Sequence, residues 1–192
     1  TLHTLFPYTT LFRSLPASPS LQHTAGSAFT FSAWLRLDQA NGEQIVLARR
    51  EGLHSLLLGL NQGTPFVEID GQRAVSTQPL NPGQWQHLAF TAEGEKLALY
   101  VNGRETASLA VAMPAFNTQL AIGADLPEAA SPHLPFAGAM DELRLSKVAR
   151  PATLLLADAS AQGAESKLVA YGVDEEQSGY GFGSLEIGRA HV

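Results

Sequence analysis

Apolar and polar side chains alternate with a period of two along residues 29–37, and this pattern restricts the chain to a β-rich fold. One side of the segment carries Phe29, Phe31, Ala33, Leu35 and Leu37, and the other carries Thr30, Ser32, Trp34 and Arg36. Successive side chains of a strand point to opposite faces of a sheet, so the pattern predicts a half-buried strand. No helical period of apolar residues occurs before Arg150, which argues against a βαβ fold.

Turn dipeptides divide the following residues into short segments. Asp70-Gly71 and Asn102-Gly103 are strong hairpin signals, because a two-residue type I′ turn needs positive φ at both positions. Further strands are predicted at residues 44–49, 54–60, 66–70, 72–77, 85–91, 96–101, 120–123 and 139–146. Many short strands separated by turns predict an antiparallel sandwich or barrel.

The pattern changes after Arg150. Pro151 suits the first position of a helix, because its φ is already helical and its missing N–H is not needed there. A short helix is predicted at residues 153–161 and a last strand at residues 167–171. The acidic and then glycine-rich residues 173–185 are predicted to form a flexible linker. The sandwich is therefore expected to span residues 15–172.

The two ends of the chain look unlike the rest. Residues 1–14 (TLHTLFPYTTLFRS) and 186–192 (EIGRAHV) resemble translated sequencing-adapter read-through. The first stretch has no alternation that leads into the sandwich, and it lacks the basic start and small-residue cleavage site of a signal peptide. Both ends are therefore expected to be non-native tails without a functional role.

Size and composition exclude several classes of protein. A chain of 192 residues suits one domain and can bury a core without metals or disulfides. The formal net charge of -6 argues against a nucleic-acid partner, and Arg49-Arg50 is the nearest thing to a basic cluster. Cysteine is absent, which excludes disulfides and thiolate metal sites. No apolar run is long enough to predict insertion of this segment into a membrane.

Three segments occur in a characteristic order: FTFSAWLRLD (29–38), PGQWQHLAFTAEGEKLALYVNGRE (82–105) and FAGAMDELRLSKVAR (136–150). They resemble the opening strand, the Trp-x-His strand with its hairpin, and the closing strand of laminin-G-like domains. The resemblance implies an all-β fold, namely an antiparallel two-sheet jelly-roll sandwich of the concanavalin A-like class with one short C-terminal helix.

A narrower resemblance involves DELRLSKVARP (141–151) and SKLVAYGVDEE (166–176). These segments are similar to large bacterial envelope proteins in which a laminin-G-like domain precedes a MotA/TolQ/ExbB-type proton-channel domain. The resemblance implies an extracytoplasmic, periplasmic location and a covalent place within a larger membrane protein.

Aromatic residues and one histidine stand out on the predicted strands. Trp34, Trp85 and Tyr100 are expected to bury large areas. His87 lies two residues from Trp85 and should share its face of the strand. A ligand contact is one interpretation of His87, and a partly buried, hydrogen-bonded structural histidine is the favoured one.

A catalytic carboxylate pair is the main alternative, because some glycoside hydrolases use the same sandwich class. Enzymes related to laminarinases carry Glu-x-Asp-x-x-Glu on one strand, and retaining hydrolysis needs two carboxyl groups about 5–5.5 Å apart. Glu68 and Asp70 begin this pattern, but Arg73 stands where the second glutamate is required. Asp70-Gly71 is also expected to end the strand. The chain is therefore predicted not to be an enzyme, with a glycoside hydrolase-like activity as the alternative.

Calcium is the one cofactor that the resemblance implies, although no cofactor is certain. Laminin-G-like domains often hold this ion with aspartate side chains and loop carbonyls, which are its preferred hard oxygen ligands. Asp141, Asp125 and Asp38 are the candidate ligands, and Asp141 comes first because it matches the aspartate of the family's closing strand. Alternatively, Asp141 pairs with Arg144.

The leading hypothesis is a non-catalytic recognition or spacer module that binds a glycan or a protein. Loops at one end or the open face of a sheet would carry the binding, and residues 124–135 form the longest loop. A purely structural domain within a TolQ/ExbB-type transport assembly is a further possibility. These functions rest on fold analogy.

Overall fold

The alternating segment forms strand β2 (Phe29–Leu37), as predicted. The computed structural model describes residues 13–126, 133–162, 170–171 and 190–191. The other strands are β1 (Arg13–Leu15), β3 (Glu43–Glu51), β4 (His54–Asn61), β5 (Thr64–Ile69), β6 (Gln72–Val75), β7 (Trp85–Glu93), β8 (Lys96–Val101), β9 (Arg104–Ala110), β10 (Leu120–Ile122), β11 (Leu134–Pro135), β12 (Gly138–Ser146), β13 (Ala170–Tyr171) and β14 (Ala190–His191). Helix α1 (Ala152–Gln162) follows β12. The predicted all-β class with a short C-terminal helix is confirmed.

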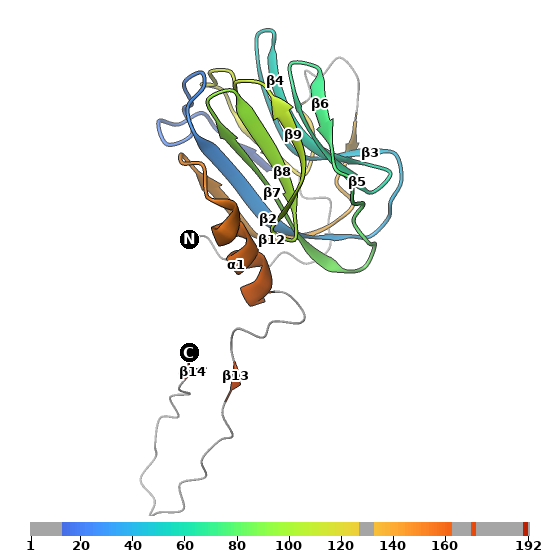
Figure 1. Cartoon of the computed structure of the whole chain (residues 1–192). Coiled ribbons are helices and arrows are strands. Elements are labelled where there is room, and N and C mark those ends of the chain that lie inside the picture. The colour runs from blue at the N-terminus through green and yellow to red at the C-terminus, as the bar shows by residue number, and fades with distance from the viewer. Residues whose placement is uncertain (1–12, 127–132, 163–169, 172–189, 192) are drawn as a thin grey trace, which may run out of the picture.

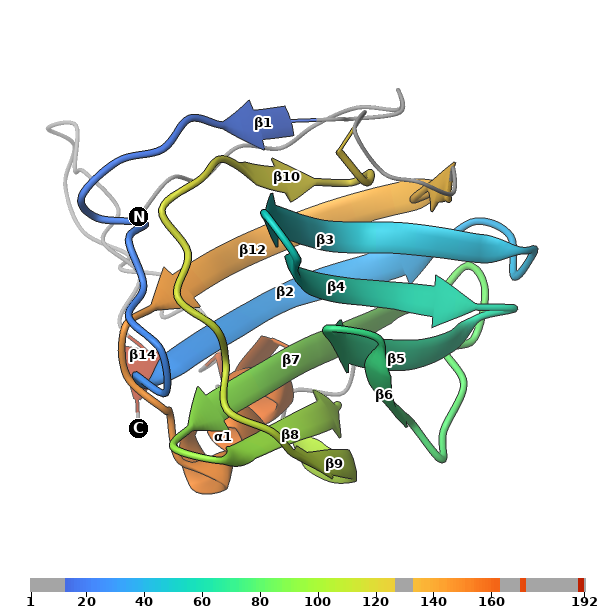
Figure 2. The same ribbon diagram turned by 90° about the horizontal axis from the view of Figure 1, so that it is seen from above.

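The strands form two facing sheets, with α1 against the outer side of one of them (Figures 1 and 2). The seven-stranded sheet has the order β1-β10-β3-β4-β5-β6, with β11 pairing β3 in parallel. The five-stranded sheet has the order β12-β2-β7-β8-β9 and is antiparallel throughout. Within the described residues, strands β13 and β14 form a separate two-stranded sheet. The two-sheet jelly-roll sandwich is therefore confirmed.

The main core lies between the two sheets. The inward residues of β2 pack there as the alternation predicts, and Phe31 stacks on Phe90 of β7 with ring centroids 6.0 Å apart. Each fully buried Phe or Leu stabilises the fold by about 1.5–3 kcal/mol through the hydrophobic effect. The two sheets are thus joined by apolar packing between their inner faces.

The second face of β2 is also buried, which the alternation alone did not predict. Thr30 Oγ1 donates to Val148 O at 2.7 Å and accepts from Arg150 N at 2.9 Å. Helix α1 covers the same sheet through a small cluster formed by Ala89, Ala98, Tyr100 and Leu155. The prediction of a half-buried strand was therefore wrong, because the chain after β12 returns over this face.

Helix α1 begins one residue before the predicted range 153–161 and one residue after Pro151. The carbonyl of Pro151 accepts from Leu154 N and Leu155 N, so this proline precedes the first helical residue, Ala152. No described helix has the length and apolar character needed to cross a membrane. Of the predicted last strand only 170–171 is described, as part of β13, and residues 173–185 lie outside the described residues. Whether residues 1–14 and 186–192 are native stays a prediction.

Both predicted hairpin turns have positive φ at each central residue. The φ angles are 49° and 80° for Asp70-Gly71 and 49° and 73° for Asn102-Gly103. The second turn also lies against α1, because a Cβ atom on Gly103 would lie 2.4 Å from Leu156 Cα. Asn102-Gly103 therefore turns the chain and makes room for the helix.

Strand β12 carries a β-bulge at an edge of the five-stranded sheet. Its register with β2 shifts between Asp141 and Arg144, and Glu142 has a φ of 50°. Asp141 Oδ1 accepts from Glu142 N at 2.8 Å, and Arg144 Nη2 donates to Glu142 Oε2 at 2.7 Å. These local bonds stabilise an unusual backbone conformation within the edge strand.

Candidate functional site

An open cleft of about 540 Å³ lies at the end of the sandwich where β2 begins and β3 ends. One wall is the segment 19–28 and the other is the segment 115–117. The cleft is lined by Pro19, Gln22, His23, Thr24, Ser27, Ala28, Glu51, Ala115, Phe116, Asn117 and Lys147. Loops at one end of the sandwich thus form a concave surface, and a binding role for the loop 124–135, of which residues 127–132 lie outside the described residues, stays a prediction.

A buried arginine holds both walls of this cleft. Arg49 Nη1 donates to Leu21 O at 2.7 Å, and Nη2 donates to Thr118 O at 2.8 Å. The residue is 4% exposed, and its guanidinium lies 5.3 Å from the ring centroid of Phe116. Paired backbone bonds between His23 and Phe116, both 2.9 Å, join the walls directly. The shape of the cleft therefore depends on Arg49.

The rim of the cleft offers both donors and acceptors of hydrogen bonds. Lys147 Nζ donates to Pro19 O at 2.9 Å, and Glu51 Oε2 accepts from Asn117 N. An ammonium has three donors and a carboxylate about four acceptor positions, so both groups keep capacity for a ligand. Such a mixed lining suits a polyhydroxylated ligand, whose hydroxyl groups both donate and accept.

Ser27 and His23 lie together in the cleft, but their geometry is not that of an activated nucleophile. Ser27 Oγ donates to Thr24 O at 2.7 Å and lies 3.3 Å from Nδ1 and 3.1 Å from Nε2 of His23. The lone pairs of the two ring nitrogens diverge, so one oxygen cannot align with both. Burial, with a smaller effect from Arg49, lowers the pKa of His23. This pair does not form the nucleophile–base contact of acyl-transfer enzymes.

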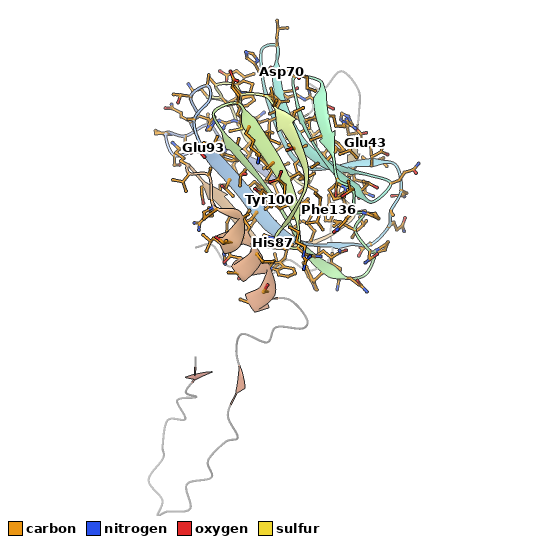
Figure 3. The ribbon with its side chains drawn as sticks, viewed as in Figure 1. Glu43, Asp70, His87, Glu93, Tyr100 and Phe136 are labelled. Carbon is orange, nitrogen blue, oxygen red and sulfur yellow. The ribbon has the colours of Figure 1, made fainter. Side chains whose placement is uncertain are left out.

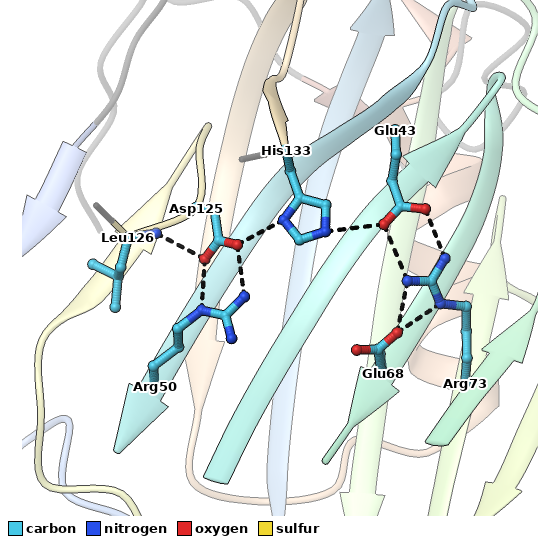
Figure 4. Close-up of polar contacts among 7 residues, drawn as sticks. All are labelled: Glu43, Arg50, Glu68, Arg73, Asp125, Leu126 and His133. Atoms are coloured by element: carbon cyan, nitrogen blue, oxygen red, sulfur yellow. Dashed lines mark hydrogen bonds and ion pairs between the residues drawn. The ribbon is translucent and has the colours of Figure 1, made fainter. Parts of the chain in front are cut away.

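A second polar site lies on the outer face of the seven-stranded sheet (Figure 4). Asp125 accepts from Arg50 Nε at 2.9 Å and Arg50 Nη2 at 2.7 Å, and Leu126 N donates to it at 2.8 Å. His133 Nδ1 lies 2.7 Å from Asp125 Oδ2. These contacts outweigh the burial of the carboxyl group and hold the pKa of Asp125 below its usual value.

Arg73 joins two glutamates on the same face. Its Nη1 and Nη2 donate to Glu43 at 2.8 and 3.0 Å, and its Nε donates to Glu68 Oε2 at 2.7 Å. The Glu43 hydrogen bond is the main cause that raises the pKa of Arg73. His133 Nε2 lies 3.2 Å from Glu43 Oε1 and so links the two halves of this ionic network.

The three predicted calcium ligands are not brought together. Asp125 belongs to the ionic network on the seven-stranded sheet, whereas Asp141 caps the bulge of β12 in the five-stranded sheet. Asp38 follows β2, and its backbone N donates to Ala137 O at 3.0 Å. Within the described part of the chain, no three His, Cys, Asp or Glu side chains form a group that could hold a metal ion. Calcium binding by these aspartates stays a prediction that the arrangement does not favour.

The partial hydrolase motif does not form a carboxylate pair. Strand β5 ends at Ile69, so the Asp70-Gly71 turn ends the strand as predicted, and Glu68 is bound by Arg73. Asp70 lies at the tip of the β5–β6 hairpin, where it accepts from Ser55 N at 2.7 Å and contacts His54 (Figure 3). Glu68 and Asp70 thus have separate structural partners.

The aromatic residues only partly follow the predictions. Trp34 and Tyr100 are buried, as expected. Trp85 was predicted to be buried but is 42% exposed, with the guanidinium of Arg36 5.5 Å from its ring centroid. Helix α1 covers the sheet at Tyr100 and leaves the first residue of β7 open to solvent.

His87 was predicted to be a partly buried structural histidine, but it is almost completely buried. It is 3% exposed, its ring lies 5.6 Å edge-on from that of Trp34, and Figure 3 places it beside α1. Its Nδ1 has no hydrogen-bond partner among the described residues, so the expected side-chain hydrogen bond at this atom is absent. Burial lowers the pKa of His87 from 6.5 to about 4, which keeps the ring neutral at neutral pH.

This neutral histidine predicts acid sensitivity of the fold. The pKa is lower in the folded state, so the unfolded chain binds the proton first and stability falls as pH drops from 6.5 to about 4. The stabilisation lost over this window is about 3 kcal/mol. Urea unfolding between pH 7 and pH 4 should show a shallower pH slope for His87→Phe than for wild type. Leu53→Ala, at an exposed position without an ionisable group, serves as a control with the wild-type slope, and equal slopes for all three proteins would contradict the assignment.

Known proteins share this architecture. The family Laminin_G_3, of the concanavalin A-like lectin/glucanases superfamily, matches residues 14–153. No curated protein sequence is significantly similar to the chain. A Bacteroides ovatus protein provisionally assigned as carbohydrate-binding has a TM-score of 0.60 and 25% identity, with 74% of this chain and 43% of that chain covered.

Two more distant structures show the fold alone. Domains LG4-5 of the mouse laminin alpha1 chain have a TM-score of 0.58 and 14% identity, over 74% of this chain and 40% of that chain. A mutant Trypanosoma rangeli sialidase with trans-sialidase activity has a TM-score of 0.59 and 16% identity, over 71% of this chain and 23% of that chain. The two-sheet sandwich agrees with the family match over residues 14–153. The chain therefore belongs to the laminin-G-like family of the concanavalin A-like lectin/glucanases superfamily.

Proposed function

We propose that this domain is a non-catalytic module that recognises a glycan in the cleft between segments 19–28 and 115–117. The observation that carries the proposal is the open cleft itself, whose rim combines the ammonium of Lys147 with the carboxylate of Glu51. Family membership and the 25% identity to the Bacteroides ovatus protein support a carbohydrate ligand. This chain spans 43% of that protein, so the function of the whole relative carries over only as a proposal.

If the glycan binds in the cleft, substitution of either charged residue at its rim should weaken glycan binding. A glycan array would identify a ligand for the wild type, and calorimetry would then compare Lys147→Met and Glu51→Gln with the wild type. Each substitution removes a polar contact at the rim, and we expect the Kd to rise about tenfold or more, because one lost charged hydrogen bond is worth about 1.5–3 kcal/mol.

Lys96→Met provides the matched control, because Lys96 lies on β8 and pairs with Glu105 away from the cleft. It should bind as tightly as the wild type. No binding on the array, or equal Kd values for the cleft variants and the control, would contradict glycan recognition in this cleft. Release of reducing sugar from the bound glycan would instead support the alternative, a glycoside hydrolase-like enzyme on the same sandwich.

We also propose that the module belongs to a larger bacterial envelope protein and lies in the periplasm. The support is the similarity of residues 141–151 and 166–176 to proteins with a MotA/TolQ/ExbB-type domain. In such a TolQ/ExbB-type transport component the module would bind a glycan or protein, or act as a spacer. Transmembrane helices in the downstream gene sequence, together with an active alkaline phosphatase fusion, would support this placement, and a cytoplasmic fusion signal would contradict it.

A further inference from the structure

Three carboxylates gather on the outer face of the seven-stranded sheet, from three separate parts of the chain. Glu43 comes from β3, Glu68 from β5, and Asp125 from the connection after β10 (Figure 4). Glu43 and Glu68 approach closely enough for both to contact Nη2 of Arg73, at 3.0 and 2.6 Å. Neighbouring carboxylates repel one another unless a cation lies between them.

Calcium is the cation that carboxylate oxygens usually bind, but here hydrogen-bond donors of the protein already occupy these oxygens. A carboxylate has about four lone-pair positions. At Asp125, Oδ1 accepts from Arg50 Nε and Leu126 N, and Oδ2 contacts Arg50 Nη2 and His133 Nδ1. All four positions are in use, and this side chain is only 4% exposed.

In the second half of the network, Arg73 occupies the oxygens of Glu43 and Glu68. Arg73 contacts both oxygens of Glu43 and approaches Glu68 with two nitrogens. Its guanidinium also stacks on the buried ring of Phe66, with 3.7 Å between the guanidinium carbon and the ring centroid. This planar stacking fixes the orientation in which a guanidinium binds two carboxylates.

His133 connects the two halves through both ring nitrogens. Nδ1 contacts Asp125 at 2.7 Å and Nε2 contacts Glu43 at 3.2 Å, so the ring spans the gap between these two carboxylates. Each of the three carboxylates also contacts a guanidinium group, and the imidazole joins the two arginine sites.

We infer that Arg50 and Arg73 occupy the structural place of a divalent cation on this face, so the domain reaches its full stability without calcium. The two arginines join the connection after β10 to β3, β5 and β6, as a bound metal ion would. The inference concerns stability and does not depend on the identity of the glycan.

The test compares melting temperatures in excess CaCl₂ and in excess EDTA. For wild type we expect no difference, whereas a calcium ion bound at about 100 times its Kd would raise the melting temperature by about 5 °C or more. Arg50→Gln and Arg73→Gln should each melt about 5 °C lower than wild type in both buffers, because each leaves half-buried carboxylates without a counter-ion. Arg104→Gln, on β9 and exposed, should melt with the wild type.

A rise in the wild-type melting temperature with calcium would overturn the inference. So would Arg50→Gln and Arg73→Gln variants that melt with the Arg104→Gln control. If either variant fails to fold, the calcium comparison on the wild-type chain still decides the question.

Discussion

Replacing Gly103 with alanine is expected to lower the free energy of unfolding by about 4 kcal/mol. Gly103 has a φ of 73°, a conformation that costs an alanine about 1 kcal/mol. The new Cβ would also lie 2.4 Å from Leu156 Cα and 2.8 Å from Leu156 N, so helix α1 would have to move away from the sheet. Overpacking and the exposure of Leu155 together account for about 3 kcal/mol.

Gly71→Ala is the matched control for this substitution. Gly71 occupies the same position of the other hairpin turn with a φ of 80°, but nothing lies within 4 Å of its would-be Cβ. It should therefore lose only about 1 kcal/mol, the cost of the backbone conformation. Chemical denaturation of both variants separates the two effects, and equal losses would show that α1 does not constrain Gly103.

Replacing Arg49 with methionine is expected to cost about 3–4 kcal/mol of stability and to loosen both walls of the cleft. Leu21 O and Thr118 O would lose their donors, at about 1–3 kcal/mol for each partly buried carbonyl left unsatisfied. Removing a buried charge offsets part of this loss, since burial already lowers the pKa of Arg49. Denaturation would measure the stability, and hydrogen exchange would follow the amides of His23 and Phe116.

Hydrogen exchange distinguishes local opening of the cleft walls from a general loss of stability. The amides of His23 and Phe116 bond across the cleft, so their protection should fall by more than that of core amides such as those of Phe31 and Phe90. Arg104→Met, on the exposed side of β9, should change neither measurement by more than about 0.5 kcal/mol. Uniform loss of protection across the sandwich would contradict a specific role for Arg49 at the cleft.

Local signals predicted most strands and two turns, because they depend on neighbouring residues. The residue types of Asn102-Gly103 predict a type I′ turn, and the positive φ of both residues agrees with this prediction. Gln62-Gly63 adopts the φ angles of Asp70-Gly71, 49° and 80°, but glutamine is not a turn signal and this turn was not predicted. Strand β9 was not assigned either, although the hairpin signal at Asn102-Gly103 requires a strand after it.

Burial by distant segments could not be predicted in the same way. The alternation along β2 gives its two faces correctly, but only the return of the chain after β12 explains why Thr30 is buried. Trp85 is exposed for the complementary reason, since α1 stops short of it. These outcomes depend on where residues 148–162 lie on the sheet, and that position is set by contacts with residues distant in the sequence.

The candidate sites were missed in sequence although one signal was present. Arg49 and Arg50 were noted only as the nearest thing to a basic cluster, but adjacent residues of a strand point to opposite faces. One of the two therefore has to point inward, and Arg49 does so beside the cleft, while Arg50 joins the outer ionic network. The partners of Arg49 are Leu21 and Thr118, and the partner of Arg50 is Asp125. Contacts between residues so far apart in the chain cannot be predicted from a single sequence.

The bulge in β12 has a consequence for how copies of this chain meet. Among the described strands, β12 ends its sheet, and a regular strand in this position would present a row of unpaired backbone groups to other molecules. The left-handed backbone at Glu142 interrupts that row, and charged side chains flank the interruption. This irregularity opposes intermolecular strand addition, the first step toward fibrils, at this edge of the sheet.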